Sequence, residues 1–127
     1  MRLLLDTHIL LAIVEDRVDG SPPRIKALLA DPGNKLDASV ASLWEIAIKH
    51  RLGKLPITPP LDAPPALIAR MEIDVLAITA RHALATVDPE PPTRDPFDRL
   101  LLAQCKVEDM RLVTIDRALV AHPHSAR

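Results

Sequence analysis

Four acidic side chains lie at points where an apolar segment gives way to a helical pattern. They are Asp6, Glu45, Asp98 and Asp116. The apolar run 3–5 leads directly into Asp6, and the apolar run 112–115 leads directly into Asp116. Because parallel strands present their carboxyl ends at one edge of a sheet, we expect these two acids to open onto the same edge. Glu45 and Asp98 lie early in their own helices, so one cleft is expected to hold all four carboxylates.

Four carboxylates in one cleft repel one another, and each raises the pKa of its neighbours. A divalent cation between them relieves this repulsion, and a ligand set made of oxygen alone favours Mg²⁺ or Mn²⁺ over zinc. A cation held in this way polarises a phosphoryl oxygen and lowers the pKa of a bound water. The acids therefore predict a metal site suited to chemistry on phosphate esters.

Each acid also has a purely structural explanation. Asp6 and Asp116 are good helix N-caps, and the run 95–98 combines a cap, a proline at the first helical position and an acid at the third. Ser42 and Glu45 have the spacing of a capping box. Capping accounts for any one of these acids, but it does not explain why three strand-to-helix junctions and one neighbouring turn are all acidic. The positive ends of the helix dipoles are expected to keep the acids ionised at neutral pH.

The remainder of the chain alternates short apolar strands with helical patterns. We expect strands over 2–5, 35–39, 74–76 and 112–115, and helices over 7–14, 22–30, 40–51, 65–71, 80–86 and 95–109. A further short helix is expected after Asp116, and Gly53 marks the end of the helix over 40–51. Alternation of this kind predicts an α/β fold with a mostly parallel sheet and helices on both faces.

The composition restricts the class of protein. The chain has 127 residues, about one domain, and 48% of them are hydrophobic, which is enough for one core. Sixteen Lys and Arg residues against 17 Asp and Glu give a net charge of −1, which excludes a strongly basic nucleic-acid coat. Aromatic residues make up 2%, too few for the base-stacking platforms of single-strand binding modules.

The cellular compartment follows from the cysteine count and the apolar runs. The single Cys105 excludes an internal disulfide and fits a reducing cytosol. The apolar run 9–14 is too short to span a membrane, and we expect no signal peptide.

Basic residues outnumber acidic ones once the four acids are set aside. Thirteen of the 17 acidic residues then remain against 16 basic residues. Lys49, Arg51 and Lys54 gather near one helix end, and Arg94 and Arg99 flank one of the acids. These side chains are candidates for holding a polyanion, although basic residues near helix ends are commonly just solvated.

Three other kinds of residue have mainly structural explanations. Cys105 lies in an apolar helical pattern and is expected to be buried and unreactive. The histidines show no metal-ligand spacing, and His122 and His124 are expected in a solvated tail. Trp44 lies within an apolar helical pattern, which predicts a place in the core or on a dimer face.

Four blocks carry a family resemblance. They are Leu-Asp-Thr-His at 5–8, the run 39–49 with Gly-Lys-Leu at 53–55, Arg-Asp-Pro-Phe-Asp-Arg-Leu-Leu-Leu-Ala-Gln at 94–104, and Leu-Val-Thr-Ile-Asp at 112–116. These blocks resemble the PIN-domain family and, more narrowly, the VapC-type toxins of bacterial type II toxin–antitoxin systems. One block alone would be weak, but four in the right order over nearly the whole chain are highly specific. The resemblance implies that residues 1–127 form a single PIN domain, a Rossmann-like α/β/α sandwich.

The same resemblance implies a Mg²⁺-dependent endoribonuclease, with Mn²⁺ as a substitute, that a VapB-like antitoxin inhibits. The family's acidic set carries over to Asp6, Glu45, Asp98 and Asp116. Asp6 and Asp98 are then the direct metal ligands, and the other two acids complete the site. We assign weaker contacts with the RNA substrate to Thr7, Lys49 and Arg99. The expected assemblies are a homodimer and a toxin–antitoxin hetero-oligomer in the cytoplasm, with no membrane partner.

The sequence departs from the family pattern in three places. Family members often carry Trp in the first helix and His just before the block at 94–98, whereas 10–14 and 91–93 contain neither here. The tail 121–127 lacks the usual aromatic-glycine ending. Because all four acids are intact, these differences concern substrate choice more than chemistry. Asp95 also matches the family pattern, but we assign it a structural role as a helix cap.

Three other functions remain as alternatives. A phosphoacceptor receiver domain has a similar length, but it needs an adjacent acidic pair after the first strand and a Lys where Asp116 stands. A phosphatase with two Asp residues separated by one fails similarly, because His8 occupies the second position. The third alternative is a PIN domain kept only as an interaction module, against which the intact acids argue.

Overall fold

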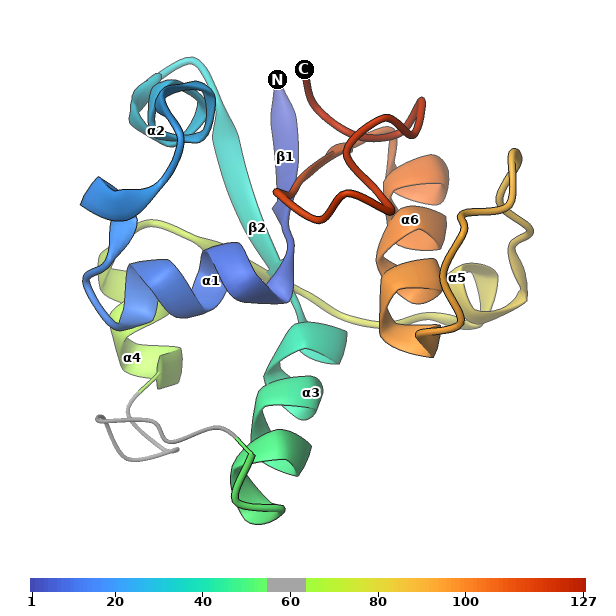
Figure 1. Ribbon diagram of the computed structural model, residues 1–127, viewed down its shortest axis with the longest axis horizontal. Coiled ribbons are helices and arrows are strands. Elements are labelled where there is room, and N and C mark those ends of the chain that lie inside the picture. Colours follow the sequence, from blue (N-terminus) through green and yellow to red (C-terminus); the bar gives the residue numbers. More distant parts are fainter. Residues whose placement is uncertain (55–63) are drawn as a thin grey trace.

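The computed structural model describes residues 1–54 and 64–127 (Figure 1). Within them the strands are β1 (Arg2–Leu5), β2 (Lys35–Ser39), β3 (Asp74–Leu76) and β4 (Arg111–Val113). The helices are α1 (Thr7–Val14), α2 (Pro23–Ala30), α3 (Val40–Arg51), α4 (Pro64–Arg70), α5 (Ala80–Leu84) and α6 (Pro96–Glu108), with a 3-10 turn η1 (Val18–Gly20). None of the helices in this part of the chain is long and apolar enough to cross a lipid bilayer. Leu55, at the end of one block of the family pattern, lies outside the described residues.

The four strands form one parallel sheet in the order β3-β2-β1-β4. The chain builds outward from β1 through β2 to β3 and then returns to the other side of β1 for β4. The strand order therefore reverses between β1 and β4, and ligands of such sheets bind outside the carboxyl ends of the strands at this point. This arrangement confirms the predicted α/β fold with a parallel sheet.

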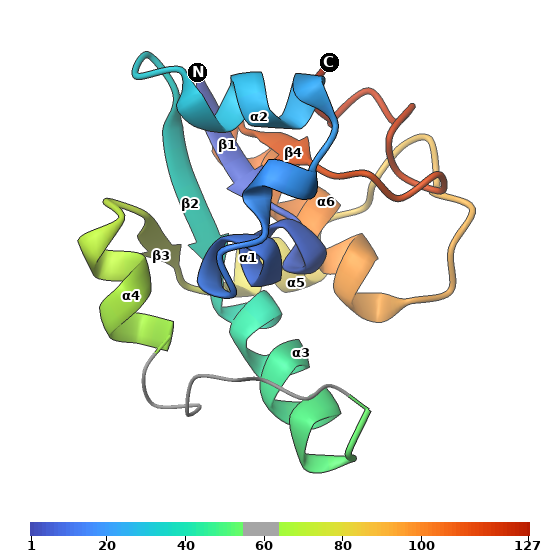
Figure 2. The same cartoon turned by 60° about the vertical axis from the view of Figure 1, so that its left-hand side comes forward.

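Two hydrophobic clusters cover the two faces of the sheet. Successive residues of a strand point to opposite faces, and Leu3 and Leu5 join α1 and α2 in one cluster while Leu4 joins α6 in the other. Figure 2 shows α1 and α2 in front of the sheet and α6 behind it. The fully apolar β1 is explained by this burial on both faces.

Local caps define the ends of the helices that surround the site. Asp6, Ser39 and Asp95 are the N-caps of α1, α3 and α6, and each side chain accepts a hydrogen bond from a backbone N–H in the first turn. The expected capping box of Ser42 and Glu45 is wrong, because α3 begins three residues earlier, at the cap Ser39. The boundaries predicted from the sequence for β2, β3, α1 and α3 are confirmed.

The C-terminal segment differs from the prediction. No helix follows Asp116; the described chain makes turns there, with Leu119 N–H and Val120 N–H both bonded to the Asp116 carbonyl. The segment then runs beside β4, where the N–H of Leu112 donates to the carbonyl oxygen of His124 and the C=O of Leu112 accepts the N–H of Ala126. A helix over these residues could not form these backbone hydrogen bonds with Leu112.

The expectation that the two C-terminal histidines lie in a solvated tail is also wrong for His122. Its side chain is buried, and its Nε2 lies 2.8 Å from the carbonyl oxygen of Pro89. His124 donates its backbone N–H to His122 Nδ1 at 3.1 Å. The end of the chain is therefore an integral part of the fold.

Candidate active site

Asp6 lies where β1 ends and α1 begins, at the carboxyl edge of the sheet. Its side chain is buried, with Oδ1 accepting the Thr7 N–H at 2.7 Å and Oδ2 accepting the Thr114 hydroxyl at 2.7 Å. Burial raises the pKa of Asp6 above its usual value, although both hydrogen bonds act in the opposite direction. The two donors hold the carboxylate in one orientation.

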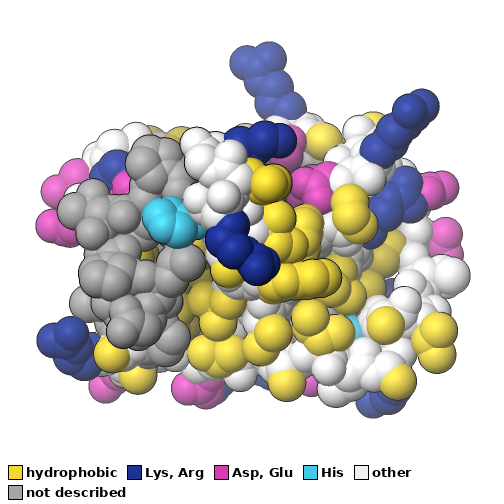
Figure 3. Space-filling model, turned by 90° about the horizontal axis from the view of Figure 1, so that it is seen from below, with side chains coloured by type: hydrophobic (Ala, Val, Ile, Leu, Met, Phe, Trp, Pro, Cys, Tyr) yellow, Lys and Arg dark blue, Asp and Glu magenta, His cyan; other side chains and the backbone are white. Residues whose placement is uncertain are grey.

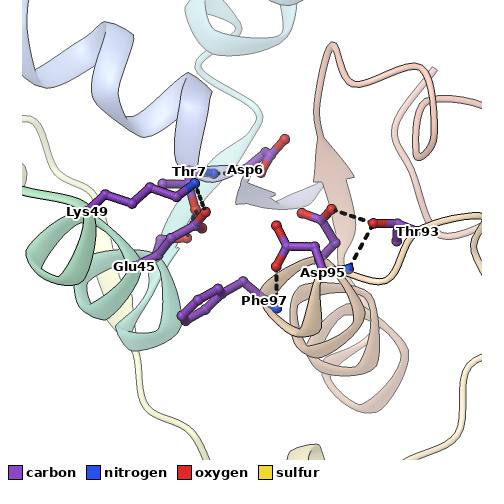
Figure 4. Close-up of polar contacts among 9 residues, drawn as sticks. Asp6, Thr7, Glu45, Lys49, Thr93, Asp95 and Phe97 are labelled. Atoms are coloured by element: carbon purple, nitrogen blue, oxygen red, sulfur yellow. Dashed lines mark hydrogen bonds and ion pairs between the residues drawn. The ribbon is translucent and has the colours of Figure 1, made fainter. Parts of the chain in front are cut away.

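Glu45 comes from the second turn of α3 and is also buried. Its Oε1 accepts the Thr7 hydroxyl at 2.7 Å, and its Oε2 accepts Lys49 Nζ at 2.6 Å (Figure 4). The Thr7 hydroxyl also lies 3.0 Å from Ser42 Oγ. Thr7 thus connects Glu45 to the end of β1, where its own N–H holds Asp6.

Asp98 lies in the first turn of α6, three residues after the cap Asp95. Its Oδ2 accepts the Thr93 hydroxyl at 3.3 Å, and the same hydroxyl accepts the Asp95 N–H at 3.1 Å. Burial, followed by the negative charges of Asp95, Asp6 and Asp116, raises the pKa of Asp98 to about 7. The helix dipole does not keep this acid fully ionised at neutral pH, contrary to the expectation.

Asp116 stands farther from its strand than expected. β4 ends at Val113, so Asp116 follows it by three residues rather than one. Asp116 Oδ1 accepts the Ala118 N–H at 2.9 Å, but it closes a turn there, so its predicted role as a helix N-cap is wrong. Its charge nevertheless acts on Asp98, so the side chain belongs to the same electrostatic cluster.

Thr114 is a site residue that sequence reasoning missed. It is buried, donates its hydroxyl to Asp6 and accepts the backbone N–H of Asp116 at 3.0 Å. One hydroxyl therefore fixes two of the four acids. A polar side chain two residues before Asp116, at the end of an apolar run, was the available signal.

The proposed substrate contacts have intramolecular partners. Lys49 pairs with Glu45, and this hydrogen bond raises the pKa of the Lys49 ammonium group. Arg99 pairs with Glu90 and donates to the carbonyl oxygen of Thr93 at 3.0 Å. Arg99 thereby holds the segment before α6, and Lys49 neutralises one of the buried acids.

The candidate ligands are of the chemical type that binds a hard cation, although they do not surround a metal position on all sides. Across 1–54 and 64–127, no group of three or more His, Cys, Asp or Glu side chains is arranged to hold a metal ion. The donors are nevertheless all oxygen, and the pKa of Asp98 is raised first by burial and then by neighbouring negative charges, which a cation would offset. Mg²⁺ usually keeps several waters and needs only one or two carboxylates, so this donor set fits it.

Comparison with known proteins places the fold. A family model of the PIN domain matches residues 3–124. No match was found among curated proteins. A chain of the VapBC2 structure from Rickettsia felis, bound to a DNA fragment from their promoter, is similar with a TM-score of 0.61 and 14% identity, over 98% of this chain and 96% of that chain. Because the family model covers nearly the whole sequence, the chain belongs to the PIN-domain family.

Proposed function

We propose that the protein is a VapC-type toxin, a Mg²⁺-dependent endoribonuclease that hydrolyses RNA phosphodiester bonds. The observation that carries this proposal is the cluster of Asp6, Glu45, Asp98 and Asp116 at the carboxyl edge of the sheet, where their charges act on one another. PIN domains are generally nucleases, and the family assignment removes support from the receiver-domain and phosphatase alternatives.

The acids divide into two roles in this proposal. Asp98 and Asp6 hold the cation, which when bound polarises a phosphoryl oxygen and lowers the pKa of a coordinated water. Asp116 and Glu45 orient the waters around it. Thr7 and Thr114 fix the orientation of two carboxylates, because the Thr7 hydroxyl donates to Glu45 and the Thr114 hydroxyl donates to Asp6.

Positive charge beside the acids favours a polyanionic substrate. Lys49 acts electrostatically on Asp95 and Asp98 as well as on Glu45. Arg99 lies one residue beyond Asp98 and is half-buried. We propose that both side chains contact RNA phosphates, with Thr7 contributing through the position of Glu45.

We also propose that a VapB-like antitoxin neutralises the enzyme. The similar structure from Rickettsia felis is of a VapBC2 complex, which supports a partner of this kind. An extended basic segment of the antitoxin that crosses the acidic edge would pair an Arg with the carboxylates, because such charge-assisted pairs are strong.

A second copy of the chain is the proposed partner of an exposed apolar face of α3. This α3 face consists of Val40 and Trp44 on α3 together with Leu52, which follows the end of the helix; these residues are 37%, 58% and 62% exposed. Val40 and Trp44 are four residues apart and therefore lie on the same side of the helix. Figure 3, seen from the carboxyl edge, shows hydrophobic side chains gathered on this side of the molecule. Trp44 is therefore not a core residue, and the dimer face is the remaining explanation.

Cleavage of a mixed single-stranded RNA pool by antitoxin-free protein tests the proposed activity. The assay compares Mg²⁺, Mn²⁺ and EDTA, and it includes Asp98→Asn together with Asp109→Asn as a matched control. Asp109 ends α6 in the left-handed conformation, which Asn tolerates, and it is exposed. We expect cutting that disappears in EDTA and in Asp98→Asn but persists in Asp109→Asn. Cutting that EDTA leaves intact would contradict the metal dependence, and no cutting at all would favour the silent interaction module.

A further inference from the structure

A buried amide on α6 connects the two helices that carry Glu45 and Asp98. Gln104 is 0% exposed, and its Oε1 lies 2.6 Å from the hydroxyl of Ser39, the N-cap of α3. Its Nε2 lies 3.3 Å from the carbonyl oxygen of Ala77 and 3.3 Å from His82 Nδ1. One side chain therefore joins α6 to the start of α3, to the end of β3 and to α5.

The partners fix the direction of every hydrogen bond. The Ala77 carbonyl only accepts, so the Gln104 amide nitrogen must face it and the amide oxygen must face Ser39. The Ser39 hydroxyl accepts the Ala41 N–H at 3.0 Å and donates its proton to Gln104. His82 Nδ1 also accepts the Thr79 N–H at 3.0 Å, so the neutral ring carries its proton on Nε2.

This network pairs both the oxygen and the nitrogen of the Gln104 amide. Ser39 is 0% exposed and His82 is 2% exposed, so neither side chain has water in place of Gln104. An apolar residue at position 104 would leave the Ser39 hydroxyl proton without its acceptor, whereas His82 Nδ1 would keep the Thr79 N–H. The network is therefore rigid, because breaking any part of it exposes several groups to a desolvation penalty.

The hydrogen bond between Gln104 and Ser39, called the joint below, connects α6 to α3 at a short distance from the acids. Glu45 lies six residues after Ser39 on α3, and Asp98 lies six residues before Gln104 on α6. At 1.5 Å per residue, each acid lies about 9 Å along its helix from the joint. The edge-to-face contact of Trp44 with Phe97, with ring centroids 5.8 Å apart, joins the same helices next to the acids. A shift at the joint therefore changes the spacing of the two carboxylates.

We propose that Gln104 is a positioning residue that sets the distance between Glu45 and Asp98 and thereby the metal affinity of the site. This inference rests on the proposed metal-dependent function. Gln104 contacts neither acid directly. It acts through α3, which begins after Ser39 and carries Glu45, and through α6, which carries both Gln104 and Asp98. Groups hydrogen-bonded directly to metal ligands change metal affinity or activity by about 10–100-fold when they are removed, and we expect the lower end of that range for Gln104, which acts through the helices.

The experiment measures Mn²⁺ affinity by calorimetry on RNA-free protein, with stability measured in parallel. Gln104→Met keeps the side chain's size but removes its polar atoms. Leu102→Ala is the control, because Leu102 is a fully buried residue of the same helix that makes no part of the network. We expect Gln104→Met to bind Mn²⁺ about 10-fold or more weakly than the wild type. Leu102→Ala should lose stability but keep its metal affinity.

A second variant keeps the inference testable if Gln104→Met does not fold. Ser39→Ala removes the same hydrogen bond from the α3 side, and Ser39→Thr restores a hydroxyl. We expect weak Mn²⁺ binding in Ser39→Ala and recovery of binding in Ser39→Thr. In RNA cleavage by Ser39→Ala, we expect kcat to fall by a larger factor than KM rises. Gln104→Met and Ser39→Ala affinities within twofold of the Leu102→Ala value would overturn the positioning role alone. A wild-type protein that binds no Mn²⁺ would overturn the proposed function, and this inference with it.

Discussion

Asp98 is the carboxylate whose charge depends most on pH near neutrality. Its pKa of about 7 arises from burial and from the charges of Asp95, Asp6 and Asp116. The folded protein therefore retains a proton at Asp98 between its usual pKa of 3.8 and pH 7, where the unfolded chain has lost it. The folded state binds more protons in this window, so the stability of the metal-free protein must fall as pH rises through it.

The replacement Asp98→Asn tests this sign. The amide cannot ionise, so the variant should be more stable than the wild type at pH 8, by a few degrees in Tm, and equal to it near pH 3.5. Thermal unfolding in EDTA at a series of pH values measures the difference. Asp109→Asn serves as the control and should show no such trend. A constant difference between wild type and Asp98→Asn at all pH values would contradict the raised pKa.

Thr114 has a separate prediction because it holds Asp6 and Asp116 together. Thr114→Val keeps the shape of the side chain but removes the hydroxyl that donates to Asp6 and accepts from Asp116. We expect RNA cleavage to fall about 10–100-fold and the free energy of unfolding to fall by about 1–3 kcal/mol. Thr114→Ser retains the hydroxyl and should keep most of the activity. Equal rates for the Val and Ser variants would remove Thr114 from the site.

At the scale of elements, the C-terminal segment acts as an additional edge beside β4. Leu112 bonds to His124 and Ala126 through its N–H and C=O, and Arg24 of α2 donates to the carbonyl oxygens of Ala126 and Thr114 at 3.1 Å. Deletion of residues 122–127 should lower the free energy of unfolding by about 2–4 kcal/mol, at about 1 kcal/mol for each lost hydrogen bond. Chemical denaturation measures this, with deletion of Arg127 alone as the control. Equal midpoints for the two deletions would show that the segment only covers the surface.

The sequence predicted elements whose signals are local. β2, β3, α1 and α3 were placed from apolar patterns, caps and the stop at Gly53, whose φ of +70° suits glycine. The predicted helix after Asp116 was wrong because the pairing of the C-terminal segment with Leu112 is a long-range contact. No local pattern reports which segment lies beside a strand.

The site shows the same division between local and distant contacts. The caps Asp6 and Asp95 and the pair of Glu45 with Lys49 follow from spacing within a few residues. The bonds from Thr7 to Glu45 and from Thr114 to Asp6 span 38 and 108 residues. Fold topology therefore predicted that the four acids lie at one edge of the sheet, but sequence reasoning missed the hydroxyl groups that orient Glu45 and Asp6.

At the scale of the whole molecule, the α3 face predicts self-association. Leu52→Glu should convert a homodimer into a monomer, because a buried unpaired charge at the interface is costly. Leu84→Glu is the control, since Leu84 on α5 is 82% exposed and lies outside the α3 face. Sedimentation measures the mass, and Trp44, the one tryptophan, reports burial through its emission wavelength. A wild-type monomer with solvent-exposed Trp44 emission at every concentration would contradict the proposed dimer.

The central claim is that four carboxylates from separate elements act as one metal-dependent centre. Single-turnover cleavage of a defined RNA by Asp6→Asn, Asp98→Asn and the double variant tests it most directly, with Asp109→Asn as the control. We expect each single variant to lose about 100-fold or more, equivalent to about 2.7 kcal/mol of transition-state stabilisation. The double variant should be no slower than the slower single variant, because groups that act as a unit are strongly non-additive. Losses that multiply in the double variant, or single variants as active as Asp109→Asn, would contradict a shared centre.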